Sequence, residues 1–218
     1  MTDPTPDLLR LPTLPRIVER LQSALADEAT RREAFFEWLT PDTKAEFING
    51  DIVMPSPARD AHIAATGRLV QVLGTYVTLH GLGMVRAEKS LVSLTRNDYE
   101  PDVCFFGTEK AARITPATLR YPAPDLAVEV LSESTEARDR GVKMDDYAAH
   151  GVAEYWIVDA DAQTVEQYLL DEPAEAYRLA MKSASGEIAS VAVDGLVLPV
   201  RAVFDDAAAL AALRAILA

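Results

Sequence analysis

The sequence predicts an α/β (α+β) fold in which a mixed β-sheet is flanked by helices, and three observations lead to this prediction. Helical periods alternate with short β-prone runs along the chain, as expected when helices cover a mixed sheet. Residues 125–131, DLAVEVL, are almost wholly apolar, which is typical of a strand buried on both faces. Asn49-Gly50 lies between two β-prone runs and predicts a hairpin, because both turn positions need positive φ.

The helices are predicted from apolar residues that recur every three or four positions. Pro15 suits a first helical turn, and Thr40-Pro41-Asp42 ends the second helical stretch. Gly81 and Gly151 are expected to end two later helices, because glycine is common just after a helix C-terminus. The predicted helices cover residues 14–25, the stretch that reaches 39, and residues 59–80, 132–150 and 205–217.

The strands are predicted from β-branched and aromatic runs between turn signals. Pro55-Ser56-Pro57 ends the Asn-Gly hairpin, which covers residues 45–54. The later strands are predicted over residues 85–94, 102–106, 125–131, 154–158 and 164–170, with a further pair between 176 and 200. Together these elements predict one core that extends from about residue 44 to 170.

The composition is that of an ordinary globular protein. Of the 218 residues, 49% are hydrophobic and 25% are charged, which argues against a disordered or fibrous chain. This length suits one domain with extensions, since a domain has roughly 100–200 residues. We expect an N-terminal helical extension over residues 1–43, a core over 44–200 and a C-terminal helix over 201–218.

Cysteine content and hydropathy indicate the compartment. The single cysteine, Cys104, excludes a disulfide framework and a zinc site built from cysteines. No apolar run reaches the roughly 18 residues that span a bilayer. The acidic, proline-rich start MTDPTPDLLR differs from a signal peptide. We therefore expect a cytoplasmic protein that does not bind membranes.

The charge of the chain limits its partners. The formal net charge of −13 argues against nonspecific binding of polyanions, because phosphate affinity comes from lysine and arginine. The charge is uneven, however. Residues 59–143 carry 11 basic and 11 acidic side chains, so the middle of the chain can form a neutral or basic groove between acidic flanks.

Two carboxylates lie in apolar strands. Asp102 begins a strand that continues Val-Cys-Phe-Phe, and Glu129 lies within Leu-Ala-Val-Glu-Val-Leu. An ionised carboxylate in such surroundings costs several kcal/mol unless it is paired or bound to a metal. The alternatives are a sheet-edge position or a salt bridge for Glu129, and turn chemistry after Glu100-Pro101 for Asp102.

Lys143 is one of five lysines, against sixteen arginines, and falls on the helix that follows the Glu129 strand. Asp139, Lys143 and Tyr147 share one helix face, because they are spaced i, i+4, i+8. Two carboxylates suit Mg²⁺, and a lysine can position a water or stabilise charge on a phosphate. The alternative is an ordinary ion pair on an exposed helix face.

Two further side chains are weaker candidates. Glu46 precedes the Asn-Gly turn, and the alternative interpretation is an ordinary exposed residue of a strand. His62 lies near a helix start, and the alternative interpretation is a capping or surface residue. The sequence lacks the P-loop, dinucleotide-binding, nucleophile-elbow and zinc-protease motifs and has no paired C-x-x-C. P-loop hydrolysis, Rossmann cofactors, α/β-hydrolase chemistry and the common zinc folds therefore lose support.

The order of these motifs resembles a known family. The residues that carry the resemblance are EFINGDIVMPSP at 46–57, His62, Gly81 and Gly83, PDV at 101–103, PDLAVEVLS at 124–132, Asp139, Lys143, Tyr147 and GVAEYWIVD at 151–159. The set is similar to the Uma-two family of restriction-endonuclease-like proteins, within the PD-(D/E)XK nuclease superfamily. The resemblance covers about residues 44–170 and implies that the core expected over 44–200 is restriction-endonuclease-like, a mixed β-sheet flanked by helices.

The resemblance implies a Mg²⁺-dependent nuclease site, with Mn²⁺ as a substitute, built from Asp102, Glu129 and a lysine. The superfamily pattern places that lysine two residues after the acid, where this chain has Leu131. The family pattern assigns the role to Lys143 and matches Glu46 to an additional acid. His62 matches a family position without an assigned role. We expect Asp102, Glu129 and the carbonyl of Val130 to bind the metal.

These observations lead to two hypotheses of different classes. The first is a Mg²⁺-dependent endonuclease that hydrolyses DNA phosphodiester bonds. We expect it to be a homodimer, because residues 14–25 and 205–217 are amphipathic additions and duplex cleavage needs two sites. The second is a catalytically idle member of the fold that binds protein or nucleic acid as a regulatory module. Another metal-dependent hydrolase is a third, weaker alternative.

Overall fold

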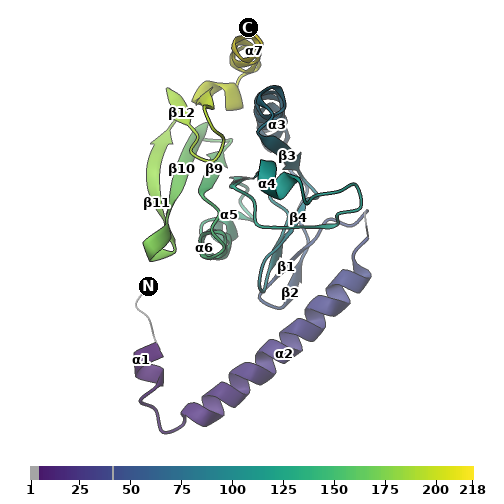
Figure 1. The fold of residues 1–218 in the computed structure, drawn as a ribbon, viewed down its shortest axis with the longest axis vertical. Helices are drawn as coiled ribbons and strands as arrows, with labels where there is room; N and C mark the ends of the chain where they lie inside the picture. The colour runs from purple at the N-terminus through teal and green to yellow at the C-terminus, as the bar shows by residue number, and fades with distance from the viewer. Residues whose placement is uncertain (1–4, 41) are drawn as a thin grey trace.

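The computed structural model describes residues 5–40 and 42–218 and has a mixed six-stranded sheet at its centre (Figure 1). The strand order is β11-β10-β9-β8-β6-β3. Strands β8 and β9 are parallel, and the other neighbours are antiparallel. The six strands are β3 (Gly83–Ala87), β6 (Val103–Gly107), β8 (Leu126–Val130), β9 (Glu154–Asp159), β10 (Thr164–Asp171) and β11 (Ala176–Ser183). The predicted fold class, a mixed sheet flanked by helices, is confirmed.

A second sheet of five short strands lies beside the first, in the order β2-β1-β5-β4-β7. Its strands are β1 (Glu46–Ile48), β2 (Asp51–Val53), β4 (Leu91–Ser93), β5 (Asp98–Tyr99) and β7 (Arg120–Tyr121). The Asn-Gly hairpin is confirmed: Asn49 has φ 51° and Gly50 has φ 90° between the antiparallel strands β1 and β2. A small third sheet pairs β12 (Glu187–Ala189) with β13 (Val197–Pro199).

Helices cover both faces of the central sheet. Leu69 and Leu73 of α3 pack against Trp156 on one face, where α7 also joins the core. Tyr147 of α6 packs against Tyr155 on the other face. Every residue of β8 is buried, as its apolar sequence predicts. The helices are α1 (Thr5–Leu8), α2 (Leu14–Trp38), α3 (Asp60–His80), α4 (Thr108–Ala111), α5 (Glu136–Asp139), α6 (Val142–Ala149) and α7 (Asp206–Ile216), with 3₁₀ turns η1 (Glu172–Ala174) and η2 (Val200–Val203).

Four predicted elements are wrong in their extent. The strand predicted over residues 85–94 divides into β3 and β4, because Glu88 has φ 65° and turns the chain out of the first sheet. The helix predicted over 132–150 divides into α5 and α6 at Gly141, whose φ of −121° and ψ of −106° are not helical. The two helical stretches predicted before residue 40 form one helix, α2, which no proline or glycine interrupts between Ile17 and Trp38.

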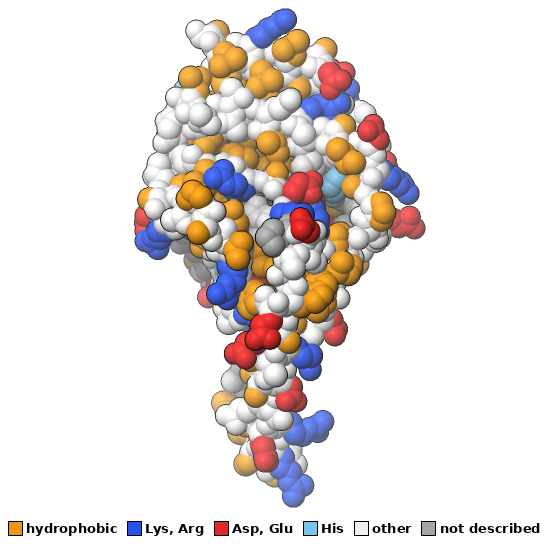
Figure 2. All heavy atoms as spheres, turned by 90° about the vertical axis from the view of Figure 1, so that its right-hand side faces the viewer, with side chains coloured by type: hydrophobic (Ala, Val, Ile, Leu, Met, Phe, Trp, Pro, Cys, Tyr) orange, Lys and Arg blue, Asp and Glu red, His pale blue; other side chains and the backbone are white. Residues whose placement is uncertain are grey.

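Helix α2 extends from the body of the molecule as an arm, which crosses the lower part of Figure 1. Its C-terminal half is anchored: Arg32 binds the buried carboxylate of Asp98, and the Phe35 ring lies 5.6 Å from that of Phe47. Its N-terminal half leaves Leu21 55% exposed and Leu25 50% exposed. In Figure 2 the narrow extension below the body carries charged and hydrophobic side chains.

The C-terminal helix α7 differs from this arm. Its Ala209 and Ala212 are buried in the main core cluster, and α7 packs against α3. Its apolar face is therefore already covered within the chain.

Among residues 5–40 and 42–218, none of the helices combines the length and the hydropathy of a membrane-spanning segment.

Candidate active site

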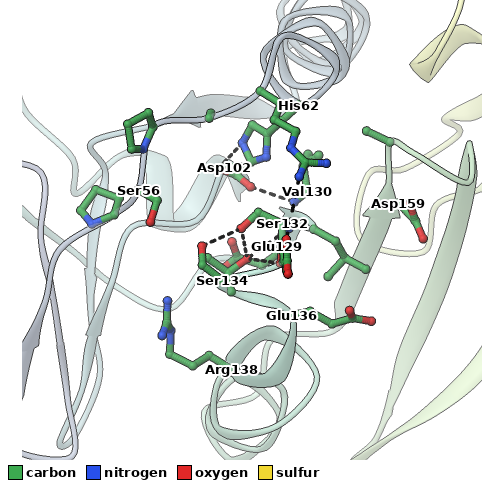
Figure 3. A pocket seen from close by; sticks show the side chains of 18 of the residues that line it. Ser56, His62, Asp102, Glu129, Val130, Ser132, Ser134, Glu136, Arg138 and Asp159 are labelled. Carbon is green, nitrogen blue, oxygen red and sulfur yellow. Dashed lines mark hydrogen bonds and ion pairs between the residues drawn. The ribbon is translucent and has the colours of Figure 1, made fainter.

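A pocket of about 890 Å³ opens at one end of the two sheets, and Figure 3 shows the side chains around it. Its wall is formed by the connection between β2 and α3, the loop that follows β8, and the turn between β9 and β10. The sequence-predicted residues Asp102, Glu129, Lys143 and Glu46 all line it, together with His62. The fold therefore brings together all four side chains that the sequence singled out, and the backbone of Val130 with them.

Asp102 and Glu129 are neighbours because β6 and β8 are antiparallel. Val103 of β6 pairs with Val128 of β8. Asp102 directly precedes Val103 and Glu129 directly follows Val128, so the two acidic residues lie at the same end of the strand pair. Oδ2 of Asp102 accepts a hydrogen bond from the backbone N–H of Val130 at 2.8 Å. This bond fixes the Asp102 carboxylate beside the end of β8.

His62 contacts the other oxygen of Asp102. Its Nε2 lies 3.2 Å from Oδ1 of Asp102, and this hydrogen bond raises the pKa of His62 above its ordinary value. Its Nδ1 is buried without a hydrogen-bond partner among the described residues. The interpretation of His62 as a capping or surface residue is therefore wrong, because its ring lines the pocket and binds Asp102.

Glu129 lies on the central strand β8, and only 3% of it is exposed. Its Oε1 accepts hydrogen bonds from Nζ of Lys143 at 3.0 Å and from the hydroxyl of Tyr147 at 3.3 Å. Burial raises the pKa of Glu129, and the charge of Lys143 opposes that rise. The sheet-edge alternative for Glu129 is wrong, whereas the salt-bridge alternative describes a contact that is present.

Lys143 is buried among carboxylates. Its Nζ lies 2.8 Å from Oε1 of Glu46, 3.0 Å from Oε1 of Glu129 and 3.4 Å from Oδ1 of Asp139. Burial alone would lower the pKa of Lys143, but these three carboxylates raise it well above its ordinary value. The side chain is therefore a charged ammonium inside the pocket, and an exposed helix face is excluded because Lys143 is only 3% exposed.

Glu46 reaches the site from the second sheet. Its Oε1 accepts the backbone N–H of Glu100 at 3.0 Å and also contacts Lys143, so it is not the exposed strand residue of the alternative interpretation. Sequence reasoning missed Glu100 itself, which is 6% exposed and lines the pocket. Burial raises the pKa of Glu100 to about 7. The only signal was its place just before Pro101-Asp102, which is equally typical of a turn.

The pocket is acidic as a whole. Its lining includes four basic side chains, Lys44, Arg59, Arg138 and Lys143. It also includes eight acidic side chains, Glu46, Glu100, Asp102, Glu129, Glu133, Glu136, Asp159 and Asp161. The excess of carboxylates attracts cations and repels a phosphate until a cation is bound.

The donors present fit a hard divalent cation. Carboxylate and carbonyl oxygens are the ligands that Mg²⁺ prefers, and Mg²⁺ often uses one or two carboxylates and keeps several waters. Asp102 and Glu129 supply two carboxylates at adjacent strand ends. Within residues 5–40 and 42–218, no three His, Cys, Asp or Glu side chains are already grouped for a metal. A two-carboxylate site with water ligands does not need such a group.

Comparison with known proteins agrees with this fold. A crystal structure of a "putative nuclease belonging to DUF820" from Anabaena variabilis ATCC 29413 superposes with a TM-score of 0.67 at 19% sequence identity. The alignment covers 78% of this chain and 94% of that one, so the two share a fold. No curated protein matches the chain.

The family comparison extends further than the motifs themselves. The Uma2 model, described as "Putative restriction endonuclease", matches residues 32–201. That range begins within the anchored half of α2 and ends in η2, and it includes every residue of the pocket lining. The chain therefore belongs to the Uma2 family.

Proposed function

We propose that this chain is a Mg²⁺-dependent endonuclease that hydrolyses DNA phosphodiester bonds, with Mn²⁺ as a substitute ion. The observation that carries the proposal is the meeting of the Lys143 ammonium with Glu129 and Glu46 in a pocket that Asp102 also lines. An ammonium that stabilises charge, beside carboxylates that can hold a metal ion at the ends of adjacent strands, suits metal-assisted hydrolysis of a phosphodiester. The family assignment supports a nuclease.

Asp102, Glu129 and the carbonyl of Val130 would hold the metal ion, by the donor chemistry described above. When bound, Mg²⁺ polarises the phosphate and lowers the pKa of a coordinated water. The N–H of Val130 and the ring of His62 hold the Asp102 carboxylate in place before the ion arrives. A cation bound by Asp102 would compete with His62 for this carboxylate.

Lys143 supplies the electrostatic part of the reaction. Its ammonium donates hydrogen bonds, and the surrounding carboxylates keep it protonated. From this position it orients the attacking water and stabilises the negative charge that develops on the phosphate oxygens. Glu46 also contacts the ammonium, at 2.8 Å, so it acts as a positioning residue.

Cleavage of supercoiled plasmid DNA tests the proposal. Incubation with Mg²⁺ or Mn²⁺ should produce nicked or linear DNA, and an excess of EDTA should abolish the reaction. Single-stranded DNA and RNA of the same sequence should be offered in parallel, because the proposal specifies DNA. Absence of cleavage with either ion, or cleavage that persists in EDTA, would contradict it.

We also propose that two copies pair through the exposed half of α2. Leu14, Val18, Leu21 and Leu25 are spaced 4-3-4, which is the a/d spacing of a coiled coil. In that register every charged residue between 14 and 27 falls on the outer positions, namely Arg16, Glu19, Arg20 and Asp27. A single exposed helix gains stability by burying such a stripe, and a second copy supplies a matching one.

Light scattering tests the pairing. The wild-type protein should have about twice the 23.7 kDa mass of one chain at micromolar concentration. Leu21→Asp places a charge in the stripe and should give a monomer, whereas Ser23→Asp changes an outer position and should stay dimeric. A wild-type mass of one chain would overturn the pairing.

One observation favours the alternative of a catalytically idle binding module. Within the described residues no three metal-ligating side chains are pre-arranged, and Lys143 already neutralises Glu129. Calorimetric titration with Mg²⁺ and Mn²⁺ distinguishes the two. The nuclease should bind one of these ions through Asp102 and Glu129, whereas an idle module need not.

Because the single cysteine is buried and unpaired, we propose a reducing compartment, the cytoplasm, for either function.

A further inference from the structure

We propose that Arg138, with the hydroxyls of Ser56 and Ser134, forms an anion subsite in the outer wall of the pocket. Its ligand would be a backbone phosphate of the polynucleotide next to the phosphate that is cut. This inference rests on the proposed nuclease function and adds a substrate contact to it. Arg138 belongs neither to the residues that the sequence singled out nor to the proposed metal ligands.

The first observation is that Arg138 has no anionic partner. The three other cations of the lining are paired: Lys44 with Glu88, Arg59 with Asp161, and Lys143 with three carboxylates. No ion pair or hydrogen bond of the Arg138 side chain is found among the described residues, and its Nε is buried without a partner. A buried guanidinium N–H without a hydrogen-bond acceptor is unfavourable, and a bound anion supplies that acceptor.

The second observation is the direction of the side chain. Figure 3 shows Arg138 leaving its helix toward Ser56 and Ser134, into the pocket. Among the described residues, the Ser134 hydroxyl has one hydrogen-bond partner, the Ser132 hydroxyl at 3.2 Å, so it can turn to a ligand. Ser56 is exposed and has no hydrogen-bond partner among the described residues. A guanidinium and hydroxyl donors that line the same pocket match a phosphate, whose oxygens accept several hydrogen bonds at once.

The third observation separates this subsite from the reacting phosphate. Arg138 directly precedes Asp139, whose carboxylate faces Lys143 on the inner side of the pocket. Consecutive helical side chains point about 100° apart. In the short helix α5, Asp139 therefore points inward to Lys143 while Arg138 points to the outer wall of the pocket. Arg138 therefore contacts a phosphate beside the scissile one, while Lys143 and the two carboxylates act on the bond that breaks.

The acidic lining makes a directed contact necessary. With eight carboxylates against four cations, general attraction cannot hold a polyanion at this pocket. A bidentate guanidinium contact fixes one phosphate and so sets the position of the strand over Asp102 and Glu129. Such a contact carries no base information, so it positions the DNA without selecting its sequence.

Duplex binding measured by fluorescence anisotropy in Ca²⁺, with several salt concentrations, tests the subsite. Arg138→Ala should weaken binding about tenfold and reduce the slope of log affinity against log salt by about 1. Arg138→Lys should restore the slope and recover only part of the affinity, because an ammonium is not bidentate. Arg113→Ala is the control, since Arg113 is exposed and paired only with Glu109, outside the pocket.

Cleavage kinetics add a second readout. Arg138→Ala should raise KM about tenfold and leave kcat within about twofold of wild type, since a contact made equally in the ground and transition states affects binding alone. Titration with inorganic phosphate distinguishes a free anion from a backbone phosphate. Free phosphate should not compete with DNA at millimolar concentration; Arg138-dependent competition there would overturn the polynucleotide assignment.

The two proposals fail in different ways. If wild-type protein binds and cleaves DNA and Arg138→Ala does so with unchanged KM and salt slope, the subsite is wrong and the nuclease stands. If wild-type protein neither binds nor cleaves DNA, both are overturned. Circular dichroism of each variant shows whether it is folded, and Arg138→Lys keeps the test valid if the alanine variant is unstable.

Discussion

Nζ of Lys143 lies 3.0 Å from Oε1 of Glu129, although the two residues stand 14 positions apart on a helix and a strand. In the PD-(D/E)XK pattern that the sequence resembles, the lysine is two residues after the acid. In this chain that position is Leu131, which packs into an apolar cluster. The Lys143 ammonium therefore reaches the end of β8 from α6, the second helix after that strand. The role proposed for Lys143 depends on the convergence of β8 and α6 in space and not on spacing along one strand.

The first prediction concerns Lys143 itself. Lys143→Ala should lower the turnover of DNA cleavage about 10²–10³-fold, the usual range for loss of one preorganised electrostatic donor. Metal affinity should change little, because lysine is not a ligand. Cleavage rates and calorimetric titration with Mg²⁺ measure the two effects. An unchanged cleavage rate would mean that another group performs the role.

The burial of Lys143 requires a control for folding. Removing it leaves three carboxylates without their cation, which costs about 3–5 kcal/mol when a buried charge loses its partner. Thermal unfolding should be measured before any rate is interpreted. Lys143→Arg keeps the charge and should fold better, but it should restore little activity, because a planar guanidinium does not replace a compact ammonium.

The second prediction concerns Glu129. Glu129→Gln should weaken Mg²⁺ binding about tenfold or more, because an amide is a poorer ligand for a hard cation than a carboxylate. Activity should fall as a consequence and recover in part at higher metal concentration. Metal titrations of cleavage rate measure this directly. A loss of activity with unchanged metal affinity would place Glu129 outside the metal site.

The third prediction concerns the anchoring of α2. Arg32 binds both oxygens of Asp98 at 2.6 and 2.9 Å, and the Asp98 side chain is 0% exposed. Arg32→Ala should therefore destabilise the protein by about 3 kcal/mol, since it leaves a buried carboxylate without its cation. Urea unfolding measures the loss. Arg16→Ala, on the exposed half of the same helix, should be neutral; an equal effect of both would refute the anchor.

The fourth prediction concerns pH and Glu166, which lies outside the pocket. The Arg140 guanidinium donates hydrogen bonds to both carboxylate oxygens of Glu166 and lowers the pKa of Glu166 to about 2. A lowered pKa stabilises the folded protein above the ordinary value of 4.5, and this contribution is lost as the pH falls toward 2.

Glu166→Gln should therefore lower the free energy of unfolding by about 1.5–3 kcal/mol at pH 7. The difference in the free energy of unfolding between the variant and the wild type should shrink as the pH falls from 4.5 to 2. Urea unfolding at pH 7, 4 and 2.5 measures the trend. A difference that stays constant over this range would show that the carboxylate does not ionise with the lowered pKa.

Local patterns predicted much of the fold. The buried strand β8 follows from an apolar run, and the hairpin follows from Asn49-Gly50, because each depends on a few adjacent residues. The break at Gly141 escaped prediction because one glycine inside a helical period is usually tolerated. In this fold a Cβ there would lie 2.8 Å from the carbonyl oxygen of Ala137, four residues earlier, so the backbone at the break between α5 and α6 leaves little room for a side chain.

The candidate site divides in the same way. Asp102, Glu129 and Lys143 stand out because charged side chains in apolar or lysine-poor surroundings are conspicuous in the sequence itself. Glu100 and Arg138 do not, since each lies among other polar residues. Their importance comes from burial without a hydrogen-bond partner for one atom, and that depends on which segments meet around the pocket.

The most direct test of the nuclease site compares plasmid cleavage by wild-type protein and by Glu129→Gln, purified in parallel and assayed at one Mg²⁺ concentration near the wild-type requirement. The account predicts metal-dependent cleavage by the wild type and a rate at least about tenfold lower for the variant, since its metal site is weakened. Equal cleavage by both preparations, or none by the wild type with Mg²⁺ or Mn²⁺, would contradict the assignment of this pocket as a metal-dependent nuclease site.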